Sequence, residues 1–426
     1  MSIYDNLKNR KEKVGVIGLG YVGLPLAHAF SKSFDVIGYD IDDGKIKDYK
    51  KGIDRTNEVG NEALNNSHIQ FTTEESMLGE PIFIIVTVPT PIKPDKSPDL
   101  SPIINATEMI ARNMKRGAYI IYESTVYPGV TEELCIPLIE KQTGMTCGKD
   151  FFVGYSPERI NPGDPVNRVE NIMKIVAGTN DNVTRTIGEV YGEIIVAGIH
   201  EAPSIKVAEA AKVLENSQRD VNIGFMNEMA MILDKMNINT QDVLEAMSTK
   251  WNALGFYPGL VGGHCIGVDP YYFIYQAEQL GYHSQIISAG RKINNSVPEF
   301  IVQSLVKRMI QNNINVNNSR VLVFGLAFKE NTADIRNSKV LDIIDLLNDY
   351  NINVDIIDDV VEPVTSKKFN HIDINEIQSD QYDALVYAVD HNSFKKLGDI
   401  ERFIKDTGIV MDLKNRFVER ANVWKL

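Results

Sequence analysis

The chain contains 426 residues, of which 43% are hydrophobic and 24% are charged, a composition typical of a folded protein with two or three domains. A chain of this length buries a large core without needing disulfides or structural metals. Its formal net charge of −13 argues against nucleic acids and anionic membranes as partners, because both favour basic surfaces, but it is compatible with a small anion in a locally basic pocket.

The cysteine content and the N-terminal segment both indicate the cellular compartment in which the protein is expected. The three cysteines, Cys135, Cys147 and Cys265, are few, odd in number and never spaced as CxxC, which is typical of a reducing compartment. Residues 1–13 hold no apolar stretch long enough for a signal peptide, and no run of about 20 apolar residues suggests a membrane span. We therefore expect a cytoplasmic protein.

From residue 14 to about residue 198, short apolar runs alternate with helical stretches. Five of the runs predict buried strands: Val14–Ile17, Asp35–Tyr39, Pro81–Val88, Ala118–Tyr122 and Phe151–Tyr155. This alternation predicts an α/β domain with a parallel, doubly wound sheet, which we place at residues 1–200.

The first of these strands runs directly into the glycine-rich sequence Gly18–Gly23. Gly18 permits a tight turn, Gly20 lets the backbone approach a pyrophosphate, and Gly23 lets the following helix pack closely on the sheet, with its free N–H groups facing the phosphates. Asp40 ends the next strand, where an acid binds the ribose hydroxyls and favours NAD over NADP. The strand, the helix and the acid together predict dinucleotide binding rather than an ordinary glycine turn.

Strand signals fade between Ser204 and about Val297. Residues 204–238 form one helical pattern without proline, long enough to join domains or to form a subunit interface. The glycine-rich residues 255–270 interrupt the helical character. We therefore expect a helical domain at residues 201–300.

A second, smaller α/β domain is expected at residues 301–426. Its predicted strands are Arg320–Phe324, Val354–Ile357, Ala384–Ala388 and Ile409–Met411. The strand that ends at Phe324 meets only one glycine, Gly325, so this domain lacks the dinucleotide motif and suits a different nucleotide.

Seven sequence blocks carry a family resemblance, and they occur in this order: GLGYVGLP (18–25), VPTP (88–91), ESTVYPG (123–129), SPERINPGD (156–164), KVLEN (212–216), GGHCIGVDP (262–270) and GLAFKENTADIRNS (325–338). Together they resemble the UDP-glucose/GDP-mannose dehydrogenase family over nearly the whole chain. Residues 249–272 and 52–59 look like those of the bacterial UDP-N-acetylhexosamine 6-dehydrogenases of surface-polysaccharide synthesis.

The resemblance implies two Rossmann-like domains joined by a long helix and a helical dimerisation region. It implies an N-terminal NAD domain, a C-terminal domain that binds a UDP-sugar, and a homodimer. The implied reaction is a four-electron oxidation of the C6 hydroxyl of UDP-GlcNAc or UDP-GalNAc to the uronic acid. Two NAD are reduced, a thiohemiacetal and then a thioester form on one cysteine, and the product serves capsule, O-antigen or other surface polysaccharide.

Such a reaction needs a covalent tether, because four electrons leave one carbon without release of the aldehyde. The candidate is Cys265, which follows two glycines and would have a lowered thiol pKa if it opened a helix. Its alternative interpretation is an inert buried thiol. We interpret Cys135 and Cys147 as structural, and the adjacent His264 as a packing or conformational residue.

The resemblance assigns further catalytic roles. Lys212 and Asn216 share one helix face and would stabilise an oxyanion, although a surface lysine and a surface amide would show the same spacing. Asp269, four residues after Cys265, would act as an acid/base or water-positioning group, or alternatively only as a helix-terminal acid. Glu158 would perform acid/base work, including thioester hydrolysis.

Further contacts come from the resemblance. Expected at the cofactor, besides the glycines and Asp40, are Tyr21, Val22, Lys45, Pro89, Thr90, Thr125 and Arg336. Thr125 would also position the catalytic water, and Lys45 is equally compatible with a solvated helix face. Expected at the sugar nucleotide are Glu158, Arg159, Asn161, Lys212, Asn216, Tyr257, Gly262 and Lys329. We expect no metal.

Other interpretations stay open at this point. UDP-ManNAc and UDP-glucose are possible substrates, and residues on Trp251–Leu260 are expected to shape the choice. A two-electron dehydrogenase of the 6-phosphogluconate type needs neither a catalytic cysteine nor a UDP domain, so the GGHC block disfavours it. A nucleotide-sensing protein on a degenerate fold is disfavoured by the intact set of candidate catalytic residues.

Overall fold

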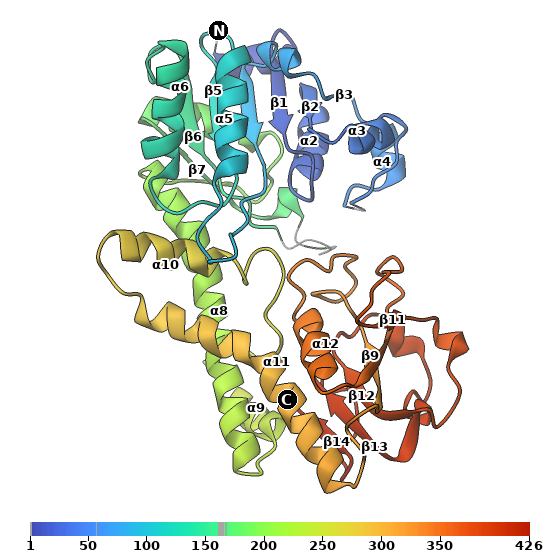
Figure 1. The fold of residues 1–426 in the computed structure, drawn as a ribbon. Helices are drawn as coiled ribbons and strands as arrows, with labels where there is room; N and C mark the ends of the chain where they lie inside the picture. Colours follow the sequence, from blue (N-terminus) through green and yellow to red (C-terminus); the bar gives the residue numbers. More distant parts are fainter. Residues whose placement is uncertain (1, 57, 161–165, 167) are drawn as a thin grey trace. The chain divides into compact units, whose positions relative to one another are not determined.

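The computed structural model describes residues 2–56, 58–160, 166 and 168–426. The chain forms two compact units (Figure 1). The first unit comprises residues 1–215 and 271–280, and the second comprises residues 216–270 and 281–426.

One eight-stranded sheet forms the centre of the first unit, in the order β3-β2-β1-β4-β5-β6-β7-β8. The strands are β1 (Lys13–Ile17), β2 (Asp35–Tyr39), β3 (Ile69–Thr72), β4 (Phe83–Val86), β5 (Tyr119–Tyr122), β6 (Phe152–Tyr155), β7 (Lys174–Gly178) and β8 (Ile199–Glu201). All neighbours are parallel except β6 and β7, which are antiparallel. The five predicted strands are confirmed, with ends shifted by a few residues at most. The pattern missed β3, β7 and β8, each of which includes polar or charged residues.

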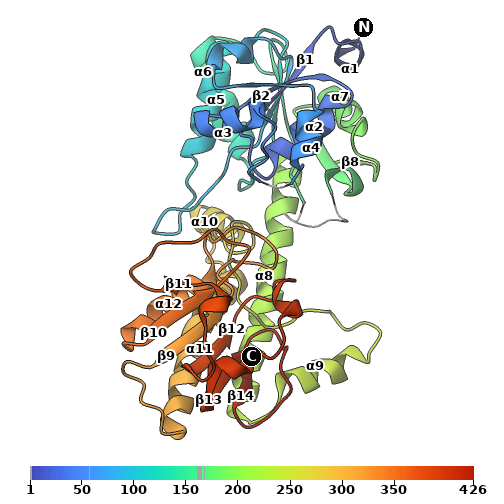
Figure 2. The same cartoon turned by 90° about the vertical axis from the view of Figure 1, so that its right-hand side faces the viewer.

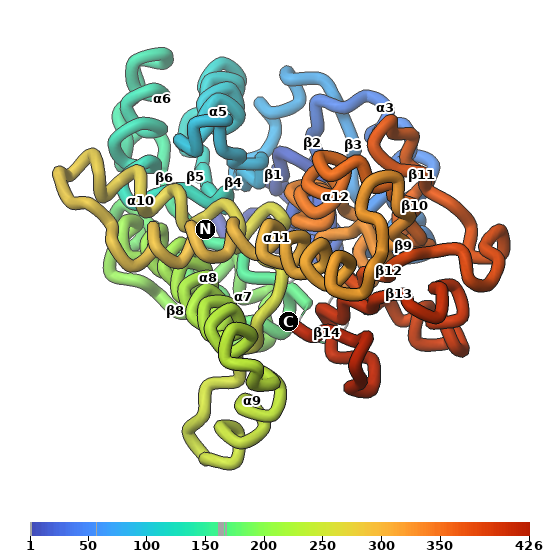
Figure 3. Tube along the Cα trace, turned by 60° about the horizontal axis from the view of Figure 1, so that its bottom comes forward, coloured from blue at the N-terminus to red at the C-terminus, as the bar shows by residue number. Residues whose placement is uncertain are grey.

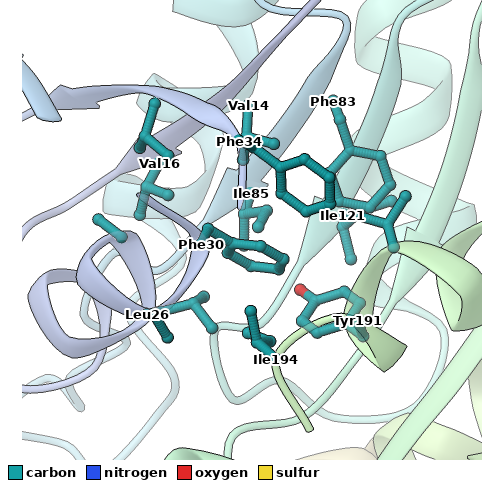
Figure 4. Packing of buried hydrophobic residues seen from close by; sticks show 14 of the residues in the cluster. Val14, Val16, Leu26, Phe30, Phe34, Phe83, Ile85, Ile121, Tyr191 and Ile194 are labelled. Carbon is teal, nitrogen blue, oxygen red and sulfur yellow. The ribbon is translucent and has the colours of Figure 1, made fainter. Parts of the chain in front are cut away.

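Helices cover both faces of this sheet (Figure 2). They are α1 (Ile3–Lys8), α2 (Gly23–Ser31), α3 (Asp43–Lys50), α4 (Asn61–Asn65), α5 (Ser101–Asn113), α6 (Ile136–Thr143) and α7 (Asp181–Gly192). Apolar residues of α2 and α7 share one core with one face of the sheet, and those of α5 and α6 share a second core with the other face. Figure 4 shows the first core, where the Phe30 and Tyr191 rings meet edge to face at 5.4 Å.

The proline-free pattern after residue 204 is a single helix, α8 (Ile205–Lys235), of 31 residues. Its start has a cap that the pattern did not reveal, because the Ser204 hydroxyl accepts a hydrogen bond from the Val207 N–H at 3.3 Å. It is followed by α9 (Thr240–Ser248), α10 (Asp269–Gln279) and α11 (Gln285–Gln311). Within the described part of the chain, no helix combines the length and the apolarity needed to cross a membrane.

In the second unit, α8 and α11 cross at two glycines. A Cβ atom on Gly224 would lie 3.1 Å from the Gly290 Cα, a tighter contact than ordinary packing, so the two glycines favour this close approach. A buried ion pair joins the same helices, because Arg291 Nη1 donates to Asp220 Oδ1 at 2.5 Å. Asn294 also donates to Asp220 Oδ1, at 2.8 Å.

A six-stranded parallel sheet completes the second unit, in the order β11-β10-β9-β12-β13-β14. The strands are β9 (Arg320–Phe324), β10 (Asn353–Ile357), β11 (Asn370–His371), β12 (Tyr382–Tyr387), β13 (Ile404–Asp412) and β14 (Val423–Lys425). Helices α11 and α12 (Lys339–Asp349) pack on one face (Figure 3). Segments with short 3-10 turns, around Phe394 and Phe403, cover the other face.

Both sheets have the strand order of a doubly wound fold. The order reverses between β1 and β4 in the first unit and between β9 and β12 in the second. Ligands of such folds bind outside the carboxyl ends of the strands at this reversal. The fold therefore points to the loops after β1, β4, β5 and β6, and to the loop after β9.

Candidate functional site

The glycine-rich loop of the first unit has the geometry that a dinucleotide requires. Gly18 has a φ of 93°, and its N–H donates to the Tyr39 carbonyl at 2.9 Å. A Cβ on Gly23 would collide with the Gly18 carbonyl and with the Thr87 hydroxyl, whereas a Cβ on Gly20 would meet nothing within 4 Å. Helix α2 begins at Gly23, as the motif predicts. The loop therefore leaves space for a pyrophosphate at Gly20 and directs the first amides of α2 toward it.

Asp40 lies at the end of β2 and is buried. Its Oδ2 accepts from the Leu19 N–H at 2.8 Å and from Lys45 Nζ at 2.8 Å, and its Oδ1 accepts from the Asp42 N–H at 3.0 Å. The Lys45 side chain, 26% exposed, therefore lies against the carboxylate rather than in solvent. This places a cation beside the acid that would bind the ribose hydroxyls.

The remaining first-unit candidates for the cofactor lie at neighbouring strand ends. Tyr21 and Val22, on the loop after β1, are half-buried. After β4, Pro89 is exposed and Thr90 is half-buried, and Thr125 is half-buried after β5. These positions share the carboxyl edge of the sheet with Gly20.

Glu158, after β6, is buried and fully hydrogen-bonded. Its Oε1 accepts from the Arg159 N–H at 2.6 Å and the Ile160 N–H at 2.7 Å, and its Oε2 accepts from Lys174 Nζ at 2.8 Å. Burial alone would raise the pKa of Glu158, but the charge of Lys174 and these hydrogen bonds outweigh it and hold the pKa below its usual value. Glu158 is therefore an oriented carboxylate.

Two buried residues beside Glu158 were missed by the sequence interpretation. Lys174 also donates to Glu123 Oε2 at 2.7 Å, and burial raises the pKa of Glu123 to about 7. Glu123 stands in the ESTVYPG block, so that block held a signal. The sequence around Lys174 gave no such signal. Strand β7 was not predicted, and a lysine beside a short apolar run resembles an ordinary strand-end residue.

Two further candidates lie next to Glu158 in sequence. The Arg159 guanidinium donates through Nε to Glu215 Oε2 at 2.9 Å, and its side chain is 31% exposed. The predicted residue Asn161 lies outside the described residues.

In the second unit, the glycines before Cys265 pack on the loop after β9. A Cβ on Gly262 would collide with the Asn337 carbonyl, and one on Gly263, which has a φ of 79°, would lie 2.6 Å from the Phe328 ring. Substrate candidate Gly262 therefore also has a packing role. The close approach links the GGHC block to the block at residues 325–338.

The expectation that Cys265 opens a helix is wrong, because α10 begins at Asp269. Residues 263–268 form turns that start from the positive φ of Gly263. The Cys265 carbonyl nevertheless accepts from the Asp269 N–H at 2.8 Å, the bond of a single helical turn. Asp269 therefore lies one turn after the cysteine.

Asp269 is held by the long helix. Asn216 Nδ2 donates to Asp269 Oδ2 at 2.5 Å, and both residues are 3% exposed. Lys212, one turn before Asn216 on α8, is 8% exposed. The alternative interpretation of Lys212 and Asn216 as surface residues is therefore wrong.

The other two cysteines have environments unsuited to nucleophiles. Burial raises the pKa of the Cys135 thiol to about 12 and that of the Cys147 thiol to about 11. Both thiols are protonated at neutral pH, and the thiolate is the reactive form.

His264 lies against residues of the segment between β9 and α12. Its ring meets Phe328 edge to face at 5.7 Å, and its Nδ1 lies 3.6 Å from Asp334 Oδ2. These neighbours fit a packing role. The guanidinium of Arg336 donates to the same Asp334 through Nε at 3.0 Å, and its side chain is 57% exposed.

Two expected sugar-binding residues lie on loops of the second unit. Tyr257 is exposed, and Asn227 anchors its loop by accepting from the Gly259 N–H at 2.8 Å. Lys329 is half-buried on the loop after β9. Asn331 on that loop donates its N–H to His391 Nδ1 at 2.9 Å.

The sequence matches three domains of one family. Residues 12–195 match the NAD binding domain of the UDP-glucose/GDP-mannose dehydrogenase family, residues 206–296 match its central domain, and residues 322–419 match its UDP binding domain. The glycine loop and Asp40 of the first unit fit the NAD that the first of these domains binds.

Individual relatives agree with this match. The UDP-N-acetyl-D-glucosamine 6-dehydrogenase of Salmonella typhi is 48% identical over 406 residues, covering 94% of this chain and 96% of that protein. Protein CapL of Staphylococcus aureus is 47% identical over 403 residues, covering 94% and 95%. The solved structure of the UDP-D-ManNAc dehydrogenase from Pyrococcus horikoshii has a TM-score of 0.88 at 30% identity, covering 97% and 98%. The chain therefore belongs to the UDP-glucose/GDP-mannose dehydrogenase family, whose members are NAD-dependent oxidoreductases.

Proposed function

We propose that the protein oxidises the C6 hydroxyl of a UDP-N-acetylhexosamine, with UDP-GlcNAc as first choice, to the carboxylate. The observation that carries the chemistry is the turn in which Cys265 is followed by Asp269, itself held by Asn216. The choice of sugar is supported by the 48% identity to the Salmonella typhi UDP-N-acetyl-D-glucosamine 6-dehydrogenase.

The proposed reaction has two oxidations separated by a covalent stage. The Gly18–Gly23 loop and Asp40 would hold NAD, which would supply a hydride acceptor for each oxidation, two NAD per sugar. After the first, the Cys265 thiolate adds to the C6 aldehyde and forms a thiohemiacetal. Loss of the second hydride leaves a thioester, and water then cleaves the C–S bond to release the acid and return the thiol. The tether keeps the half-oxidised carbon in place.

The other candidate side chains are assigned roles that fit their own environments. Lys212 supplies a buried positive charge for the alkoxide and the thiohemiacetal oxyanion, and Asn216 fixes the Asp269 carboxylate. We assign Asp269 to proton transfer at the tethered carbon. Glu158 and Thr125 are assigned to the water that hydrolyses the thioester.

Binding roles follow the domain assignment, with NAD on residues 1–200 and the sugar nucleotide on residues 301–426. Arg336, Lys329 and Arg159 offer positive charge to phosphate groups in an otherwise acidic protein. Tyr257 and Gly262 are proposed to contact the sugar, together with Asn161.

We propose a homodimer built on residues 201–300. On α8, Phe225 and Ile232 are exposed, and their spacing of seven residues places them on one helix face; Met236, directly after the helix, is exposed as well. An exposed apolar stripe of this kind is typical of a subunit interface. Light scattering on Phe225→Glu/Ile232→Glu should report a monomer, and a dimer of unchanged affinity would place the interface elsewhere.

The runner-up substrate is UDP-ManNAc. The similarity to the Pyrococcus horikoshii UDP-D-ManNAc dehydrogenase, with a TM-score of 0.88, supports this substrate. The sequence identity to that protein in the structural alignment is only 30%. The higher identity to the glucosamine enzyme decides the order. We place the reaction in the cytoplasm, where the few cysteines stay reduced, and in surface-polysaccharide synthesis.

A panel of UDP-GlcNAc, UDP-GalNAc, UDP-ManNAc and UDP-glucose tests the proposal. The highest kcat/KM should be for UDP-GlcNAc, with two NADH formed per sugar consumed. One NADH per sugar would indicate a two-electron dehydrogenase, and none with any sugar would overturn the proposed function.

A further inference from the structure

A buried group of three charged side chains lies in the first unit, at the ends of three neighbouring strands. Glu123 follows β5, Glu158 follows β6, and Lys174 is the first residue of β7. Lys174 Nζ donates to Glu123 Oε2 at 2.7 Å and to Glu158 Oε2 at 2.8 Å. The side chains of Lys174, Glu123 and Glu158 are 4%, 0% and 8% exposed. We call these three residues the buried triad.

The reversed direction of β7 brings the cation to this place. Strands β5 and β6 are parallel and end at the carboxyl edge of the sheet, where ligands bind in such folds. Strand β7 pairs antiparallel to β6, with Tyr155 opposite Ala177, so its first residue lies at that same edge. A parallel β7 would place Lys174 at the opposite edge, away from both carboxylates.

The two carboxylates of the triad accept hydrogen bonds from different donors. Fully ionised, it would carry one net negative charge in a buried setting, which is costly. Glu158 also accepts from the Arg159 and Ile160 amides, at 2.6 and 2.7 Å. Glu123 accepts instead from the Tyr191 hydroxyl, and Lys174 lies 5.4 Å from the centre of the Tyr191 ring. The amides favour the charge on Glu158, so the proton that relieves the excess charge belongs on Glu123.

We propose that Lys174 and Glu123 are positioning residues of the reaction, with Lys174 fixing Glu158 as an oriented carboxylate and Glu123 exchanging the proton that balances the buried charge. This rests on the proposed function, because it defines their roles through Glu158. An ionised Glu158 accepts a proton from water but has none to give. Glu158 therefore acts as a base in thioester hydrolysis.

The pH dependence is set by the groups around Glu123. Among the described residues these are Lys174 from β7, Glu158 after β6 and Tyr191 from α7. Burial raises the pKa of Glu123 to about 7. Above that pH its charge competes for Lys174 and makes Glu158 more basic, so kcat should rise with pH through neutrality.

The test uses the full-length enzyme with saturating NAD and UDP-sugar, and measures kcat between about pH 5.5 and 9. Glu123→Gln should remove the rise in kcat near neutrality. Lys174→Met should lower kcat by at least about tenfold, and Lys174→Arg should restore most of it. Lys32→Met, which breaks an exposed ion pair with Glu170, is the matched control and should keep wild-type kcat.

A double variant separates positioning from folding. Lys174→Met/Glu123→Gln removes one positive and one negative charge together, so it should fold even where Lys174→Met does not. Its dissociation constant for NAD should stay within about twofold of wild type while kcat stays low. A double variant with wild-type kcat and a wild-type pH profile would overturn the inference.

The two proposals fail differently. A wild-type enzyme that forms no NADH with any UDP-sugar ends the proposed function, and the roles of Lys174 and Glu123 in catalysis end with it. An active wild type whose Glu123 and Lys174 variants keep its kcat and pH profile ends only the inference about the triad.

Discussion

In each sheet, the strand that comes first in the sequence ends in the same glycine turn, but the residues after the turn differ. In the first unit, Gly18 has a φ of 93° and its N–H donates to the carbonyl of Tyr39, the last residue of β2, at 2.9 Å. In the second, Gly325 has a φ of 89° and its N–H donates to the carbonyl of Ile357, the last residue of β10, also at 2.9 Å. An aspartate comes directly after each of these last residues.

The two aspartates have different neighbours. Asp40 accepts from the Leu19 and Asp42 amides and from Lys45. Asp358 accepts from four backbone amides and from the buried His391, whose Nε2 lies 3.1 Å away. The four amides belong to Leu326, Ala327, Val360 and Val361. All of the accepting capacity of Asp358 is therefore used to hold its own loops.

The segments after the two turns also differ. Helix α2 begins at Gly23, directly after the glycine loop, whereas α12 begins at Lys339, and residues 326–338 lie between β9 and α12. The shared turn is therefore a property of the fold rather than of a ligand. The nucleotide that a unit binds depends on the residues after the turn. It also depends on whether hydrogen bonds within the protein already occupy all acceptor positions of the aspartate.

The largest expected effect separates chemistry from cofactor binding. Cys265→Ser should lower acid formation by about a thousandfold or more, because a protonated serine hydroxyl is a far weaker nucleophile than the thiolate of the proposed tether. NAD affinity, which depends on the first unit, should be unchanged by fluorescence titration. Full turnover by this variant would overturn the assigned nucleophile.

Lys212→Ala should act mainly on kcat, by about 10²–10³-fold, because oxyanion stabilisation acts in the transition state. Steady-state kinetics with UDP-GlcNAc check this expectation. A change confined to KM would instead indicate a binding role.

A matched pair of substitutions tests the two aspartates directly. Asp358→Asn should destabilise the second unit by about 2–4 kcal/mol, since the amide cannot accept from all five donors. Asp40→Asn should cost less stability and reduce NAD affinity. Denaturant unfolding and NAD titration measure both variants, and equal effects on NAD would contradict the distinction between the units.

The units should also respond to pH with opposite signs. Burial raises the pKa of Glu123 above its value in the unfolded chain, so its contribution to stability is full at acidic pH and is lost as pH rises through about 7. For Asp358, burial opposes ionisation, but the hydrogen bonds from His391 and the backbone lower its pKa strongly. Its contribution is therefore lost as pH falls through the acidic range. Calorimetry from about pH 2 to 8 should show the transition of the first unit shifting down as pH rises toward 7 and that of the second unit shifting down as pH falls below about 4. Glu123→Gln should flatten the first of these two dependences.

The smallest expected effect concerns Lys45. The pair with Asp40 is partly exposed, so Lys45→Met should change NAD affinity by about fivefold or less. Because the lysine neutralises part of the Asp40 charge, its loss should increase the preference for NAD over NADP. A ratio of kcat/KM values for the two cofactors that stays constant would remove Lys45 from cofactor selection.

The sequence determined the features that depend on residues close together in the chain. Gly18–Gly23 after a strand predicted the turn and the start of α2, and the absence of proline predicted the length of α8. Four-residue spacing placed Asp269 one turn after Cys265. Each of these features depends on backbone conformation over a few residues, which local residue types control.

The tertiary structure decided the features that depend on pairing between distant segments. Apolar patterns do not encode strand direction, so neither the reversal of β7 nor the meeting of Lys174 with Glu123 and Glu158 could be predicted. Gly262 and Gly263 pack on residues 337 and 328, which are distant in sequence, and α10 begins only at Asp269, after turns at residues 263–268. The full hydrogen bonding of Asp358 likewise depends on His391, a residue distant in sequence that folding brings to this aspartate.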